Sequence, residues 1–135
     1  MRYADWQQRF WREMDRQRTL PFVWGERDCI LYAATVGDAI SDASYVSRAR
    51  QAFKWTNVEE AARLLAGTDL RALIETVMGP MVPWARLGMG DFALVLDDRG
   101  KRSLAVHDGV RVIGAVDPGI QPIPFRCIQG GWHVT

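Results

Sequence analysis

The fold is best predicted from residues Phe22 to Ala34, which read FVWGERDCILYAA. Aromatic residues and Gly25 lead through a short charged run to Asp28, and an apolar, alanine-rich segment follows. Aspartate is a favourable N-cap, so we predict a helix that begins at Asp28 and runs to about Gly37. Cys29 then lies in the first turn, where the helix dipole favours a thiolate over a thiol.

The remainder of the first 82 residues also has helical patterns. The apolar residues Tyr3, Trp6, Phe10 and Met14 recur at steps of three and four, which predicts an amphipathic N-terminal helix over residues 1–20. Further helices are predicted near residues 45–53, after a capping box at residues 57–60, and from a cap at Thr68 or Asp69 to the Gly79-Pro80 stop.

Beyond Pro83 the helical period disappears, and glycine, proline and β-branched residues increase. Strands are predicted at residues 91–96, 103–107 and 110–116, and an Asp-Gly turn separates the last two. Residues 119–124 form a loop or an edge strand because they contain prolines, and residues 132–134 are candidates to close the sheet. Helices followed by antiparallel strands predict an α+β fold in one domain (1–135), with a helical part at 21–82 and a β-sheet half at 83–135.

The charge balance argues against some classes of partner. Lys+Arg number 17 and Asp+Glu 16, a formal net charge of +1, so neither nucleic acid nor an acidic membrane is an expected partner. Arginines and carboxylates alternate over residues 2–18, which is typical of a solvated helix face. No apolar stretch approaches the roughly 20 residues of a membrane span, and the charged N-terminal segment does not resemble a signal peptide.

Cysteine, histidine and tryptophan are the residues considered for disulfides, metal binding and interface anchoring. Two cysteines do not make a disulfide framework, and with the two histidines they lack metal-ligand spacing. We therefore predict no metal and no cofactor. The six tryptophans fit either a core or a set of interface anchors, and composition does not separate the two.

Several short motifs together resemble those of the NlpC-type papain-like cysteine hydrolases. They are Trp24-Gly25, Asp28-Cys29 before an apolar helix, and Gly90-Asp91 before a strand. The whole chain further resembles a family of short phage-encoded proteins with an F-x-W-G-x-x-D-C box, here residues 22–29, and a terminal W-x-V, here residues 132–134. Proteins of that family are encoded among tail-tip genes.

The resemblance implies a cysteine-bearing helix packed on an antiparallel sheet, with Cys29 as nucleophile and a histidine as base. His107 and His133 are the two candidates. If Gly109 matches the glycine that ends the family's histidine strand, Ser103 falls on the base position. His107 then lies about 13 Å further along that strand.

The function implied is a structural or assembly component of a phage tail tip or baseplate, built on an NlpC-like fold with a degenerate active site. Its partners are other tail-tip or hub proteins, and its location is the virion tail after synthesis in the bacterial cytoplasm. The alternative is an active cysteine hydrolase that cleaves amides of cell-wall peptide through Cys29 and His107, and a toxin-like or immunity-type protein is a third reading. In each case Asp28 is expected to cap the helix, and Trp24-Gly25 to shape the turn before it.

Overall fold

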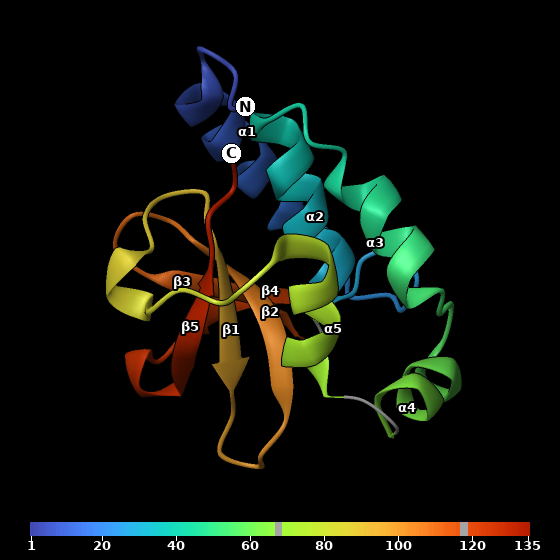
Figure 1. Cartoon of the computed structure of the whole chain (residues 1–135). Helices are drawn as coiled ribbons and strands as arrows, with labels where there is room; N and C mark the ends of the chain where they lie inside the picture. Colours follow the sequence, from blue (N-terminus) through green and yellow to red (C-terminus); the bar gives the residue numbers. More distant parts are fainter. Residues whose placement is uncertain (67–68, 117–118) are drawn as a thin grey trace.

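The computed structural model describes residues 1–66, 69–116 and 119–135. Helices fill the N-terminal part of the chain, and the C-terminal part forms a β-sheet (Figure 1). The helices are α1 (Trp6–Gln17), α2 (Cys29–Ile40), α3 (Tyr45–Phe53), α4 (Val58–Ala66), α5 (Leu70–Met78) and two single 3₁₀ turns, η1 (Trp84–Arg86) and η2 (Phe125–Cys127). The strands are β1 (Phe92–Leu96), β2 (Arg102–His107), β3 (Val112–Val116), β4 (Gly119–Ile123) and β5 (Ile128–Trp132). The prediction of an α+β fold is confirmed.

The five strands form one antiparallel sheet in the order β4-β3-β2-β1-β5. The first four strands follow each other as a meander, and β5 returns to pair with β1. In β2, Leu104 pairs with Leu94 of β1, and Val106 pairs with Ile113 of β3. These pairs place the two strands most relevant to the site, β1 and β2, at the centre of the sheet.

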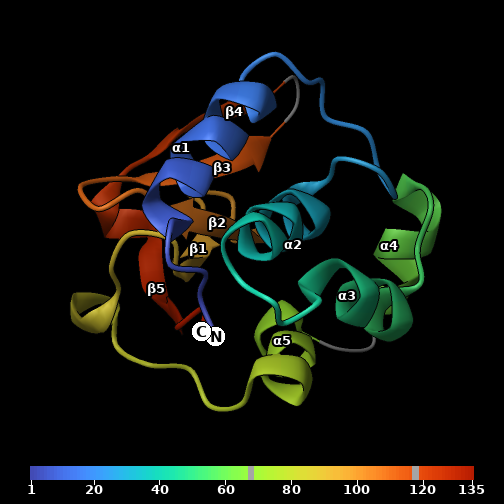
Figure 2. The same cartoon turned by 90° about the horizontal axis from the view of Figure 1, so that it is seen from above.

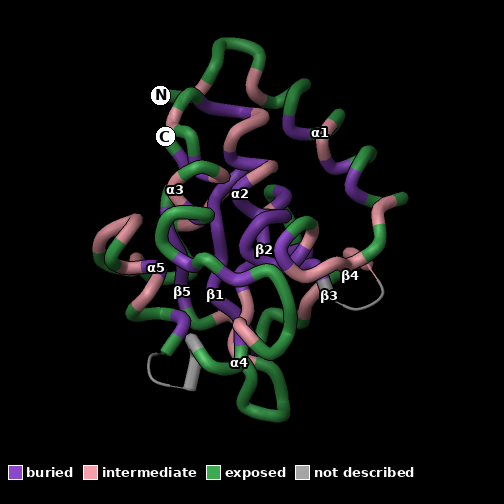
Figure 3. The backbone as a smooth tube through the Cα atoms, turned by 90° about the vertical axis from the view of Figure 1, so that its right-hand side faces the viewer, coloured by how far each residue is buried: buried purple, intermediate pink, exposed green. Residues whose placement is uncertain are grey.

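One face of the sheet carries α1 and α2, with α3 and α5 packed further out (Figure 2). The alternation of side chains along β2 separates the two faces, because neighbouring residues of a strand point in opposite directions. Leu104 and Val106 belong to the core shared with α2, whereas Ala105 lies with Val112 and Cys127 in a small second core on the other face. Figure 3 shows how buried residues concentrate where α2 meets the sheet.

Two helix boundaries differ from the predictions. The first helix begins at Trp6, because Arg2 forms a β-bridge with Ser41 and is not helical. The cysteine-bearing helix continues past Gly37 to Ile40. Gly37 does not end the helix because it is a packing position, where a Cβ would lie 2.7 Å from the ring of Tyr45.

Strand boundaries differ for local reasons too. The third strand begins at Val112, because the Asp108 carboxylate accepts the N–H groups of Val110 and Arg111 and holds them in the turn. Residues 119–123 form an edge strand, the second of the two predicted options. The closing strand is Ile128–Trp132, several residues before the predicted 132–134. Of the two predicted caps for α5, Asp69 is confirmed, and Thr68 lies outside the described residues.

Candidate functional site

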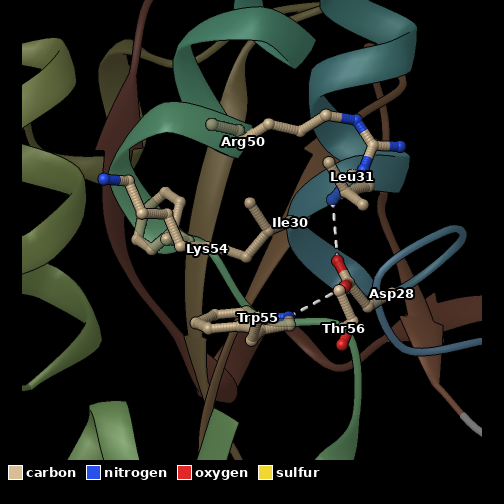
Figure 4. A pocket seen from close by; sticks show the side chains of 9 residues that line it. Asp28, Ile30, Leu31, Arg50, Lys54, Trp55 and Thr56 are labelled. Carbon is tan, nitrogen blue, oxygen red and sulfur yellow. Dashed lines mark hydrogen bonds between the residues drawn. The ribbon is translucent and has the colours of Figure 1, made fainter. Parts of the chain in front are cut away.

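Asp28 is fully buried and organises the turn before α2. Its carboxylate accepts hydrogen bonds from the backbone N–H of Gly25 (2.9 Å), the backbone N–H of Leu31 (2.9 Å) and the indole N–H of Trp55 (3.0 Å). Figure 4 shows the last two bonds at the edge of a pocket of about 170 Å³ between α2 and α3. The carboxylate is thus the predicted helix cap, and it also fastens Trp55 to the start of α2.

Gly25 and Trp24 shape the same turn. Gly25 has a φ of +82°, which glycine adopts without strain, and a Cβ there would lie 2.8 Å from the Thr56 backbone. The Trp24 ring packs edge-to-face between those of Phe22 (5.2 Å) and Trp55 (5.9 Å). These motif residues therefore build an aromatic wall beside Cys29.

Cys29 is at the first turn of α2, as the sequence predicts, but its thiol is buried, with 8% of the residue exposed. Burial raises the pKa of the thiol to about 11, and the charge of the Asp28 carboxylate adds to this effect, while the Leu104 N–H and Lys101 oppose it. A helix dipole contributes about 0.3–1 kcal/mol at such a position, less than one pKa unit. Desolvation therefore outweighs the dipole, and the thiol is held protonated at neutral pH.

The structure does not bring His107 to Cys29. His107 pairs with Val112 and shares the face of the sheet that carries Ala105, opposite the α2 face. Its Nδ1 accepts the backbone N–H of Gly109 at 2.9 Å, so the side chain is engaged in the turn after β2. Leu104 is the β2 residue in the core beside Cys29, and its side chain has no proton acceptor.

His133 does not reach Cys29 either. Its Nδ1 lies 2.9 Å from an oxygen of Asp91, a buried carboxylate at the start of β1. Asp91 also binds Arg2, and the neighbouring Tyr3 donates its N–H to Ile40 at the C-terminal end of α2. Cys29 and Ile40 are the first and last residues of α2 and lie about 16 Å apart along its axis, so His133 lies near the end of α2 opposite to Cys29.

A cleft of about 590 Å³ extends from Cys29 to the surface. It opens where the sheet divides: β2 pairs with β3 only from Ala105 onward, while Ala115 and Val116 of β3 pair with β4 alone. The cleft has an aromatic side, a basic side and a floor at the start of α2; its described lining is Phe22, Trp24, Cys29, Ile30, Trp55, Val58, Leu70, Asp97, Arg99, Lys101, Arg102, Ser103 and Ala115.

The residues that sequence reasoning missed are those brought in from a distance. Trp55 is 27 positions from its partner Asp28, and nothing in the local sequence links the two. Arg2 was assigned to a solvated helix face, yet it is partly buried against Asp91. A basic run at residues 99–102 is visible in the sequence, and only the fold places it at a cleft.

Within the described residues, neither a metal-binding cluster nor a membrane-spanning helix is found. No three His, Cys, Asp or Glu side chains among them gather in a way that would hold a metal ion. None of the helices they form is long and apolar enough to cross a membrane.

Comparison with known proteins places the chain in one family. No curated protein matches it. A family model with the description "Domain of unknown function (DUF6950)" matches residues 1–134, nearly the whole chain. The protein, with its buried Asp28 cap and its cleft beside Cys29, belongs to the DUF6950 family.

Proposed function

We propose that this protein is a non-catalytic assembly component of a phage tail tip or baseplate, built on an NlpC-like fold that retains the nucleophile position without its chemistry. The observation that carries the proposal is the environment of Cys29. A cysteine hydrolase needs a thiolate with a base in hydrogen-bond reach. Here burial raises the pKa of the thiol to about 11, and the facing strand offers Leu104.

Exposed aromatic side chains support an assembly role. Trp84 and Phe125 project from η1 and η2 with 55% and 56% of their surface exposed, and their rings are 6.4 Å apart. A pair of large aromatic residues on the surface is typical of an interface anchor. The phage setting is supported by the resemblance of residues 22–29 and 132–134 to tail-tip proteins.

Genetic complementation tests the proposal in a phage that encodes this chain. After deletion of the gene, we expect Cys29→Ala to restore plaque formation to the wild-type level. We expect Trp84→Ala with Phe125→Ala to lower the titre at least about tenfold, because interface anchors carry about 2 kcal/mol or more of binding energy. Val110→Ala is the control, since Val110 is 75% exposed and lies outside the aromatic pair.

Two results would contradict the proposal. One is the absence of the protein from purified tails by mass spectrometry. The other is loss of plaques with a folded Cys29→Ala variant, which favours the active cysteine hydrolase. That second candidate is supported by the cleft of about 590 Å³ that reaches Cys29, and it predicts cleavage of cell-wall peptide that Cys29→Ala abolishes.

A further inference from the structure

The cleft beside Cys29 combines two kinds of surface. Its apolar side consists of Phe22, Trp24 and Trp55, whose rings pack edge-to-face, with Val58 at the rim. The Asp28 carboxylate accepts the indole N–H of Trp55, so the orientation of this ring is set before any ligand arrives. A preformed apolar wall lowers the entropic cost of binding an apolar side chain.

The other side of the cleft is basic. Arg99, Lys101 and Arg102 line it, against the single carboxylate of Asp97. Asp97 is already engaged, because it accepts the backbone N–H groups of Arg99 and Lys101. The described lining of the cleft therefore carries three cationic side chains against one carboxylate, in a protein with a formal net charge of +1.

Two of the three basic side chains are available to a ligand. Arg102 is engaged, with Asp69 at 3.6 Å and a hydrogen bond to Gln129, whereas neither Arg99 nor Lys101 forms an ion pair among the described residues. The positive charge of Lys101 is felt at Cys29, where it lowers the pKa of the thiol against the larger effect of burial. Cationic groups around a concave site raise the local concentration of anionic ligands.

We propose that this cleft binds an extended segment of a partner polypeptide in which carboxylate side chains flank an aromatic or aliphatic residue. The apolar anchor lies against the aromatic wall, and the carboxylates meet Arg99 and Lys101. A volume of about 590 Å³ accommodates a few residues of such a segment. The division between β2 and β3 adds room for an extended backbone beside Ser103 and Ala115.

The aromatic geometry favours a polypeptide over a nucleic acid. Base binding relies on open ring faces for stacking. Here the rings of Phe22, Trp24 and Trp55 contact one another edge-to-face, and the Phe53 ring packs against Trp55 at 5.4 Å. That the cleft holds its partner without cleaving it rests on the proposed non-catalytic function.

Selection from a display library of random decapeptides tests the inference on the full-length protein. We expect the enriched peptides to be acidic with an aromatic or aliphatic residue at the centre. For the best of them, made with a fluorescent label, we expect Arg99→Glu with Lys101→Glu to weaken binding at least about tenfold in anisotropy titrations. Higher salt should also weaken binding, because the contacts are charged.

The control variant is Arg12→Glu with Arg86→Glu, which makes the same change in net charge at exposed positions outside the cleft. It should bind within about twofold of wild type, and equal loss in both variants would show a nonspecific charge effect and overturn the inference. Failure to enrich any peptide, or enrichment of basic peptides, would overturn it as well.

Two further outcomes separate the cleft inference from the proposed function. Soluble cell-wall stem peptides also carry carboxylates and can compete with the labelled peptide. If they displace it at a lower concentration than the unlabelled selected peptide does, the ligand of the cleft is a cell-wall peptide and not a partner polypeptide. Cleavage of the bound peptide that Cys29→Ala abolishes would overturn the non-catalytic assignment. Intact peptide with charge-dependent binding supports the cleft inference even if the protein is absent from tails.

Discussion

Asp28 is the residue on which the start of α2 depends. It is fully buried, and its two carboxylate oxygens receive three N–H donors, from Gly25, Leu31 and Trp55. Hydrogen bonds to a charged acceptor are stronger than neutral ones, and a buried donor without an acceptor loses its full hydration energy. The cap therefore also positions the aromatic wall of the cleft.

Replacing Asp28 by Asn tests this role against a matched control. Asn caps helices as well as Asp does, but its NH₂ group cannot accept the hydrogen bonds of Gly25 or Trp55. We expect Asp28→Asn to lower the free energy of unfolding in urea by about 2–3 kcal/mol. Asp69→Asn is the control, because Asp69 is an exposed cap that accepts one backbone bond from Ala72 and its pair with Arg102 lies at the surface, so the loss should stay below about 1 kcal/mol. Equal losses would mean that the additional donors contribute nothing.

The Cys29 thiol is subject to opposing effects, and burial dominates them. With a pKa raised to about 11, the thiolate fraction is about one in a thousand at pH 8 and grows tenfold with each pH unit up to the pKa. We expect iodoacetamide to alkylate Cys29, in a Cys127→Ser background, with a rate that rises tenfold per pH unit between pH 7 and 10 without a plateau. Mass spectrometry of samples quenched at successive times measures this rate.

His107→Ala should leave that profile unchanged, because His107 lies on the opposite face of the sheet. A plateau below pH 8 that disappears in His107→Ala would instead demonstrate a nucleophile–base pair in solution. The hydrolase would then become the preferred function.

Among the described glycines, Gly131 of β5 has the closest neighbouring backbone. The strand pairs with β1 on one edge, and on the other Gly131 forms a β-bridge with Val82. A Cβ on Gly131 would overlap the carbonyl oxygen of Phe92, a backbone atom that cannot move without shifting β1. Glycine is therefore required here by close approach, a usual reason for glycine within a strand.

Substitution of Gly131 should detach β5 from the sheet. We expect Gly131→Ala to lower the free energy of unfolding by more than about 3 kcal/mol, beyond the usual cost of overpacking, because the obstacle is backbone. Gly88→Ala is the control, since a Cβ at Gly88 meets nothing within 4 Å. Urea unfolding and amide exchange of β1 measure both variants, and a tolerated Gly131→Ala would show that β5 pairs less closely with β1.

At the scale of the whole molecule, the two ends of the chain meet at Asp91. The side chain of Arg2 donates to Asp91 (2.8 Å), to the Met89 carbonyl (2.9 Å) and to the Val134 carbonyl (2.7 Å). Asp91 in turn accepts the N–H of Val134 at 3.0 Å. One arginine thus connects the N-terminus, the start of β1 and the C-terminus.

Arg2→Met removes this connection and keeps the length of the side chain. The buried Asp91 carboxylate then loses its cationic partner, and we expect a loss of about 2 kcal/mol, discounted from the 3–5 kcal/mol of a fully buried pair because Arg2 is 21% exposed. Arg9→Met is the control. The ion pair of Arg9 with Asp5 is exposed and joins residues four positions apart, so the loss of stability should stay below about 0.5 kcal/mol. Thermal unfolding compares the two, and equal midpoints would show that the ends fold independently of this contact.

Local patterns were enough to predict most of the elements, and distant contacts account for the differences. The stripe that includes Phe10 and Met14 predicted α1, and the cap at Asp28 predicted α2, because both depend on residues within one or two turns. Gly37 resembled a helix stop in the sequence but is a packing position against Tyr45. The same limit applies to the site: Cys29 was predicted from its own neighbours, whereas Trp55 was not.

The α+β layout, the position of Cys29 in the first turn of α2 and the role of Asp28 as its cap could be predicted from local sequence. These features depend on periodicity and on hydrogen bonds between residues close in the chain. The burial of the Cys29 thiol and the position of His107 on the far face of the sheet became visible only in the folded chain. Desolvation depends on every layer packed around a group, and the face of a strand residue depends on register, so neither is a property of a local stretch of sequence.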